Sequence, residues 1–176
     1  VSAGCHETQH LSNDTMRMKE DFKRPLFEAI KKAVNIPIIV AGGYRNPDIS
    51  EKIVSDGVAD FLGIARPLLA DPQWPQKAAQ GKVDEIRKCL SCGECLYVRG
   101  GAFNYPQSCA VNAVFGREKD WTDIEPAPEE KKVMVIGGGP AGMEAARVAS
   151  LRGHCVSLYE KGDALGGQLL LASKPP

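Results

Sequence analysis

The sequence lacks several features that define particular classes of protein, and each absence argues against one class. Its 22 basic and 22 acidic residues cancel, so the chain lacks the net positive charge that attracts nucleic acids or anionic membranes. No apolar run approaches the roughly 20 residues of a membrane-spanning helix. Residues 1–10 lack the basic and apolar segments of a signal peptide. What remains, 43% hydrophobic and 25% charged, is typical of an ordinary globular protein.

Cysteine is scarce outside one stretch of the chain. Four of the six cysteines lie between positions 89 and 109, whereas Cys5 and Cys155 stand alone. A disulfide framework would spread its cysteines more evenly. The clustering therefore favours metal ligation in a reducing compartment, and we expect a cytoplasmic protein. Cys5 and Cys155 are interpreted as small, buried apolar residues.

The clustered cysteines have a regular spacing. Cys89, Cys92 and Cys95 recur at three-residue intervals, and Cys109 follows after residues 96–108. Three closely spaced thiolates can wrap a cubane, and the fourth ligand can come from chain that folds back. Zinc usually takes two separated pairs of ligands. The spacing thus predicts a single [4Fe–4S] cluster on these four cysteines, with a structural zinc site as the rival.

Residues 1–85 alternate between helical and strand patterns. Two short apolar runs, residues 36–40 and 61–64, predict strands that are buried on both faces. Helical patterns come before, between and after them, at residues 27–34, 49–55 and 72–79. A strand–helix–strand–helix series predicts a parallel sheet.

Glycine and arginine follow both of these strands, in the turns at residues 41–45 and 63–67. In a (β/α)₈ barrel the loops after the last two strands commonly bind phosphate. The backbone N–H groups of Gly43, Ala65 and Arg66 could cradle an anion, and Arg66 could add charge or stack on a planar ligand. From spacing alone, a plain Gly42-Gly43 turn and a surface ion pair of Arg66 fit equally well.

A dinucleotide fingerprint begins near position 131. An apolar strand at residues 131–136 precedes Gly137-Gly138-Gly139-Pro140-Ala141-Gly142, which satisfies G-x-G-x-x-G. A helix at residues 143–151 and a strand at residues 155–159 follow, and that strand ends in Glu160. Gly137, Gly139 and Gly142 would let a pyrophosphate approach the helix N-terminus, and Glu160 could accept from ribose hydroxyls.

Taken together, these motifs resemble the large iron–sulfur branch of the old yellow enzyme family, which includes 2,4-dienoyl-CoA reductase, enoate-type reductases and trimethylamine or dimethylamine dehydrogenase. The resemblance rests on GIARPLLADPQW, on CLSCGEC, and on VMVIGGGPAGMEAARVASLRGH followed by YEKGDALGGQ. It implies an α/β chain of three parts. Residues 1–85 would be the C-terminal part of an FMN-binding TIM barrel, 86–128 an iron–sulfur segment and linker, and 129–176 the start of a Rossmann-like FAD/NAD(P)-binding domain. It also implies an internal piece of a longer protein.

The resemblance assigns cofactors to the two groups of glycines. The residues that match the family's FMN phosphate turns are Gly42, Gly43, Ala65 and Arg66. Gln168, after Gly166-Gly167, matches the reductases, which bind FAD there. The C-x-x-C-x-x-C spacing is instead closer to the amine dehydrogenases, and in trimethylamine dehydrogenase that domain holds ADP. We weight the FAD-like string more and expect FAD, with ADP as the alternative.

The implied function is that of a multi-centre oxidoreductase. NAD(P)H would reduce FAD, and electrons would pass through the cluster to FMN, which reduces an activated C=C bond of a small-molecule substrate. The alternatives are an amine dehydrogenase that exports electrons to an electron-transfer flavoprotein, and a non-catalytic cluster-binding fragment. The family's catalytic residues lie mostly before Val1. Within the chain His6 is the catalytic candidate, ahead of His10 and His154, and a homo-oligomer stays open.

Overall fold

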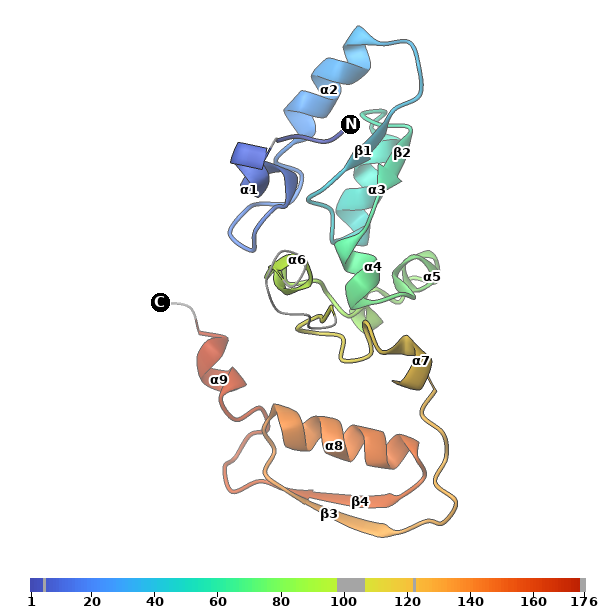
Figure 1. Cartoon of the computed structure of the whole chain (residues 1–176), viewed down its shortest axis with the longest axis vertical. Coiled ribbons are helices and arrows are strands. Elements are labelled where there is room, and N and C mark those ends of the chain that lie inside the picture. The colour runs from blue at the N-terminus through green and yellow to red at the C-terminus, as the bar shows by residue number, and fades with distance from the viewer. Residues whose placement is uncertain (5, 98–106, 122, 175–176) are drawn as a thin grey trace. The chain divides into compact units, whose positions relative to one another are not determined.

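The computed structural model describes residues 1–4, 6–97, 107–121 and 123–174 (Figure 1). The chain divides into two compact units, Val1–Glu118 and Lys119–Pro176, and each has a parallel sheet of its own. The mixed α/β class predicted from the sequence is confirmed. Among the described residues, no helix is long and apolar enough to cross a membrane.

The first unit alternates helices with two short strands. In chain order its elements are η1 (His6–Thr8), α1 (Gln9–Ser12), α2 (Arg24–Ala33), β1 (Ile39–Ala41), α3 (Pro47–Ser55), β2 (Phe61–Gly63), α4 (Arg66–Ala70), α5 (Trp74–Ala79), η2 (Val83–Glu85) and α6 (Glu94–Tyr97). A further short helix, α7 (Glu118–Trp121), lies where the two units meet in the sequence.

The sheet of the first unit is parallel, as predicted. Ile39 pairs with Phe61 and Ala41 with Gly63, and Figure 1 shows the two strands side by side. The segment at Val1 runs next to β1, because the Ala41 N–H donates to the Val1 carbonyl at 3.1 Å. Parallel pairing brings the carboxyl ends of β1 and β2 to one edge, so the turns that follow them are neighbours.

The core of this unit lies on one face of the sheet. Val40 of β1, Phe27 of α2 and Ile53 of α3 are fully buried against one another. On the opposite face Ile39 is 57% exposed and its partner Phe61 is 59% exposed. The predicted burial on both faces is therefore wrong for the chain in this structure, because α2 and α3 cover only the Val40 side. The first strand is also shorter than residues 36–40, since Pro37 has no N–H to donate.

One helix was missed by the sequence patterns. The predicted turn at residues 63–67 is overlapped by α4 at Arg66–Ala70, whose second residue Pro67 suits the first turn of a helix. After α4 the chain is held by Asp71, a buried carboxylate. It accepts from the Lys77 ammonium at 2.6 Å, from the Arg87 N–H at 2.9 Å and from the Gln73 N–H at 3.0 Å. Through the Arg87 N–H, Asp71 thereby fixes the position of the chain at Arg87, which lies two residues before Cys89.

The second unit contains β3 (Lys132–Ile136), α8 (Pro140–Leu151), β4 (Cys155–Tyr159) and α9 (Leu169–Ala172). The two strands pair in parallel, from Lys132 with Cys155 to Ile136 with Tyr159, and α8 lies along them (Figure 1). Helix α8 begins three residues before the predicted start, because Pro140 is favourable at the first helical position.

Burial in this second sheet alternates along each strand. Cys155 is exposed, so its interpretation as a buried apolar residue is wrong in the described structure. The reason is the period of two in a strand: α8 covers the face of Val156 and Leu158, and Cys155 points to the other face. Cys5 lies outside the described residues.

Replacing Asp71→Ala tests the anchor before the cysteine segment. The change leaves Lys77 and two backbone N–H groups without their acceptor, so we expect the free energy of unfolding to fall by about 2 kcal/mol. The matched control is Glu51→Ala, an exposed acid on α3, which should cost less than about 0.5 kcal/mol. Urea unfolding of both variants measures the difference, and equal losses would contradict the anchor.

The stabilisation by Asp71 should depend on pH. Burial raises the pKa of Asp71, but the hydrogen bonds from Lys77, Arg87 N–H and Gln73 N–H outweigh it and hold the pKa below the ordinary 3.8. The stabilisation is therefore complete above the unfolded-state pKa and is lost as pH falls through the lower folded-state pKa. The gap in unfolding free energy between wild type and Asp71→Ala should be constant at neutral pH and shrink in strong acid.

Candidate metal centre and anion-binding turns

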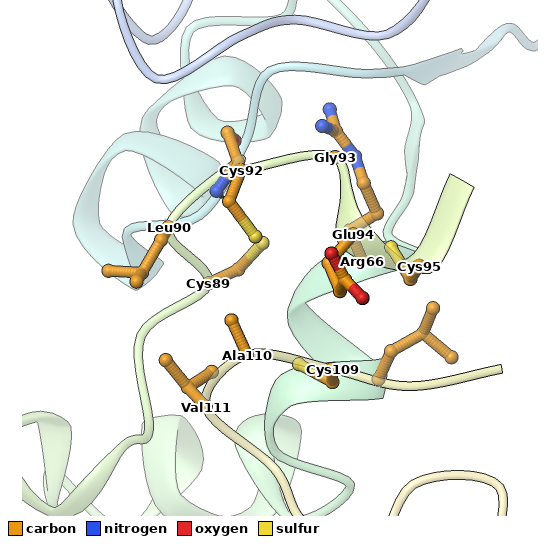
Figure 2. Close-up of a pocket in the computed structure, with 12 residues that line it drawn as sticks. Arg66, Cys89, Leu90, Cys92, Gly93, Glu94, Cys95, Cys109, Ala110 and Val111 are labelled. Atoms are coloured by element: carbon orange, nitrogen blue, oxygen red, sulfur yellow. Dashed lines mark hydrogen bonds between the residues drawn. The ribbon is translucent and has the colours of Figure 1, made fainter. Parts of the chain in front are cut away.

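The four predicted metal ligands line one pocket of the first unit. Figure 2 shows the sulfur atoms of Cys89 and Cys92 next to each other, that of Cys95 to the right of them and that of Cys109 below, with Leu90 pointing away. Cys92 is exposed and the other three are partly buried. The structure thus brings together all four residues that the spacing singled out.

The loop that carries the first cysteines is bent by two left-handed residues. Ser91 has φ 51° and Gly93 has φ 83°, and the Leu96 N–H then donates to the Gly93 carbonyl at 2.8 Å to begin α6. Glycine adopts a positive φ freely, whereas serine does so at a cost. Ser91 also turns its N–H towards the Cys89 sulfur, at 3.4 Å. Such N–H···S contacts stabilise a thiolate and tune the potential of any cluster it holds.

Cys109 is held in place by residues that carry no metal-ligand signal. Buried Asn112 donates from its side chain to the Leu69 carbonyl of α4 at 2.8 Å, and its N–H donates to the Cys109 carbonyl at 3.3 Å. The Ser108 hydroxyl donates to Glu94 at 3.1 Å, which links the same segment to α6. The return of the fourth cysteine is therefore fixed by side-chain contacts that sequence spacing could not reveal.

The four thiols lie close enough to affect one another. Burial raises the pKa of Cys95, and the neighbouring Cys89 and Cys109 raise it further, while the charge of Arg66 opposes them. In the described part of the chain, no three His, Cys, Asp or Glu side chains are arranged to hold a single metal ion. The cysteines surround the pocket instead of converging on one point.

The first glycine turn is held from outside by two acids. Gly42 and Gly43 have φ of 94° and 89°, values that disfavour other residues. The buried Tyr44 hydroxyl donates to Asp21 at 2.8 Å, and burial, then this hydrogen bond, raises the pKa of Tyr44. Glu20 accepts from the Arg45 N–H at 2.9 Å and from its guanidinium at 3.2 Å.

The second turn meets the first in a pocket that also reaches the cysteines. Arg66 lines this pocket together with Gly42, Gly43, Arg45 and Cys89. Within the described residues, the backbone N–H groups of Gly43, Ala65 and Arg66 donate to no other group. Gly43 is buried and lines the pocket, so a backbone N–H there without a protein acceptor suits an anion. Ala65 is exposed and its side chain does not line the pocket.

Arg66 is not a surface ion-pair partner. Its guanidinium donates to the Asp14 carbonyl at 2.7 Å and also to the Asp14 carboxylate, which is only 2% exposed. No sequence pattern marks Asp14, because an acid in a loop far along the chain from Arg66 has no characteristic spacing.

Lys23 is a second residue that the sequence reasoning missed. It is 4% exposed, and its ammonium lies so near the first turn that a Cβ built on Gly42 would come within 2.6 Å of it. Burial lowers the pKa of Lys23, which Asp14 partly offsets and Arg66 reinforces. Lys23, Arg45 and Arg66 thus lie at the two turns together with the acids Asp14 and Glu20, which pair with the two arginines.

The dinucleotide fingerprint of the second unit has the geometry that its glycines predict. Gly137 has φ 101°, and a Cβ on Gly142 would come 1.9 Å from the Gly137 carbonyl oxygen, so only glycine fits there. A Cβ on Gly139 would meet nothing within 4 Å, which leaves space above the turn. The second glycine pair packs against this turn, because the Gly166 N–H donates to the Gly138 carbonyl at 2.8 Å.

Glu160 and Gln168 lie at the same turn with different roles. Glu160 accepts from the Gly138 N–H at 2.6 Å and the Gly162 N–H at 2.9 Å. The bonds from Gly162 and then Gly138 hold its pKa below the ordinary range. A carboxylate has lone pairs left to accept a ribose hydroxyl. Gln168 is exposed and precedes α9, where its carbonyl accepts from Ala172 at 3.1 Å.

The histidines give little support to a catalytic role. His6 begins η1, and its side chain lies outside the described part of the structure. His10 lines a cavity with Asp14, Arg66 and Cys92. His154 accepts the Lys131 N–H at 3.2 Å, which is a structural contact at the start of the second sheet.

Comparison with protein families identifies the chain. Residues 4–85 match the NADH:flavin oxidoreductase / NADH oxidase family, and residues 135–172 match an NAD(P)-binding Rossmann-like domain. Residues 4–85 therefore belong to the NADH:flavin oxidoreductase / NADH oxidase family, which confirms the resemblance inferred from the motifs.

Named relatives match the whole chain. It is 49% identical over 178 residues to an NADH oxidase from Thermoanaerobacter brockii, covering 100% of this chain and 27% of the relative. It is 42% identical over 174 residues to a cinnamate reductase from Clostridium sporogenes, covering 98% of this chain and 26% of the relative. The chain thus spans about a quarter of the length of these relatives.

Solved structures show the same likeness. A 2-naphthoyl-CoA reductase matches with a TM-score of 0.86 and 36% identity, over 99% of this chain and 26% of that one. Histamine dehydrogenase from Rhizobium sp. 4-9 matches with a TM-score of 0.80 and 34% identity, over 90% of this chain and 24% of that one. Both a reductase and a dehydrogenase therefore share this part of the fold.

The fingerprint geometry makes a paired prediction. Gly142→Ala places a Cβ against the Gly137 carbonyl, and because the obstacle is backbone the turn must shift, at a cost of about 1–3 kcal/mol. Gly139→Ala, the matched control with φ −72° and open space, should cost less than about 1 kcal/mol. Urea unfolding compares the two variants, and similar losses would show that the close approach at Gly142 is unimportant.

Proposed function

We propose that this chain forms part of an NAD(P)H-dependent flavin and iron–sulfur oxidoreductase that reduces an activated C=C bond, of the enoate or dienoyl-CoA reductase type. Cys89, Cys92, Cys95 and Cys109 hold a [4Fe–4S] cluster, and the turns at Gly42-Gly43 and Arg66 hold the phosphate of FMN. When bound, flavins supply hydride chemistry and a cluster supplies one-electron transfer.

The observation that supports this proposal is that two neighbouring pockets share lining residues. Cys89, Arg66 and Ser91 line both the pocket of four cysteines and the pocket of the two glycine turns. A pocket lined by the four cysteines thus adjoins a pocket lined by Gly42, Gly43 and the side chains of Arg45 and Arg66. An anionic cofactor and a metal cluster held there would be neighbours, which is the arrangement that electron transfer requires.

The second unit supplies the features of a dinucleotide site. The open space over Gly139 admits a pyrophosphate, and the N-terminus of the twelve-residue helix α8 favours its charge. Glu160 orients the turn and disfavours a 2′-phosphate near it. We propose that FAD occupies this site, with ADP as the alternative.

Cysteine substitution in the full-length protein tests the cluster. We expect about four irons per chain and a visible absorbance that dithionite bleaches, as for a Cys₄ [4Fe–4S] centre. Cys109→Ser should lose most of the iron and the colour. The control Cys155→Ser, at an exposed position in β4, should retain both. A colourless wild-type protein with one zinc per chain would contradict the assignment of a [4Fe–4S] cluster.

An amine dehydrogenase is the second candidate, favoured by the C-x-x-C-x-x-C spacing and by the likeness to histamine dehydrogenase. Two measurements on the full-length protein separate the candidates. NADH oxidation that depends on a conjugated enoate or enoyl-CoA, with FMN and FAD released on denaturation, supports the reductase. Reduction of an artificial acceptor by a methylated amine, with ADP released in place of FAD, would overturn it.

A further inference from the structure

Asp14 and Ser91 occupy the junction between the cavities of the first unit. Both line the pocket of the two glycine turns and a third cavity beside Cys92, and Ser91 also lines the cysteine pocket. Both are buried, at 2% and 4% exposure. Asp14 belongs to no motif, and Ser91 lies inside CLSCGEC without being a predicted metal ligand. The proposed function gives neither of them a role.

The two side chains connect the arginines of the anion-binding turns to the cysteine loop. The Ser91 hydroxyl donates to the Asp14 carboxylate at 3.2 Å and accepts from the Arg45 guanidinium at 3.0 Å. Asp14 in turn binds Arg66 through its carbonyl and its carboxylate. Each arginine that lines the pocket of the glycine turns is therefore one or two hydrogen bonds away from Ser91.

Ser91 can transmit a change in these contacts to the metal ligands. It lies between Cys89 and Cys92 in a left-handed conformation, which a serine keeps only when its surroundings hold it. That conformation aims its N–H at the Cys89 sulfur. If the side-chain contacts weaken, the backbone can relax and the N–H···S contact lengthens, which lowers the reduction potential of a cluster.

An anion in the pocket of the glycine turns would compete for the same donors. Arg45 and Arg66 line that pocket, and a phosphate would draw their guanidinium groups away from Ser91 and Asp14. We propose that Asp14 and Ser91 are positioning residues that couple the anion pocket to the cysteine loop, so that phosphate binding and the redox state of the cluster influence each other. This inference rests on the proposed function.

Coupling of this kind must be reciprocal. If phosphate lowers the reduction potential of the cluster, the oxidised cluster must tighten phosphate binding by the same factor. The test uses full-length protein with its cluster loaded and its FMN removed. Calorimetry measures the dissociation constant of inorganic phosphate with the cluster oxidised and with it reduced. In the wild type we expect oxidation to tighten binding about fivefold or more.

Variants separate this link from direct repulsion between charges. Ser91→Ala keeps every charge, so repulsion persists, but the ratio of the two dissociation constants should fall to half or less of the wild-type ratio. The control is Ser50→Ala, a buried serine whose hydroxyl donates to the Asn46 carbonyl at 2.8 Å within α3, and it should keep the wild-type ratio. Equal ratios in wild type and Ser91→Ala overturn the inference.

A second variant covers poor cluster loading. If Ser91→Ala does not retain the cluster, Asp14→Asn is titrated in the same way, and an unchanged ratio there also overturns the inference. If neither variant retains the cluster, a wild-type ratio near one overturns it, whereas a fivefold ratio together with loss of iron from both variants supports the link. Absence of any cluster or FMN from the wild type would instead overturn the proposed function.

Discussion

The buried ion pair between Arg66 and Asp14 is the contact on which the first unit depends. Both groups of Asp14 that accept from Arg66 lie out of solvent, and removing one partner of such a pair typically costs about 3–5 kcal/mol. The pair joins the turn after β2 to the N-terminal segment. Through Ser91 it also reaches the cysteine loop. Three stretches of chain that are distant in sequence thus meet around one charge pair.

The backbone imposes a second constraint at the glycine turns of both units. Gly42 and Gly43 adopt left-handed conformations where parallel strands deliver two turns to one edge, and Gly142 lets α8 approach the Gly137 carbonyl. In each unit the missing side chains let the backbone adopt a turn that other residues could not form. Short parallel strands therefore position both glycine turns without a large sheet.

Much of this arrangement was predictable from local patterns. The parallel pairing, the bounds of β4, the end of α3 at Ser55 and the fingerprint all follow from apolar periodicity and from glycine and proline placement. Local sequence patterns did not predict helix α4, the early start of α8 or the exposure of Ile39. Helix ends depend on capping contacts, and strand burial depends on which faces other elements cover.

The candidate functional residues can be read from the sequence alone. Four cysteines at metal-ligand spacing, two glycine turns with an arginine, and a complete dinucleotide fingerprint are local properties, because ligand type and backbone freedom are set residue by residue. Several contacts are known only from the tertiary structure. Cys109 lines the pocket of the other three cysteines, and Arg66 donates to Asp14. Lys23 lies beside the first glycine turn, and Ser91 lines the cysteine pocket. Those contacts join residues far apart in the chain, and no pattern within one segment encodes them.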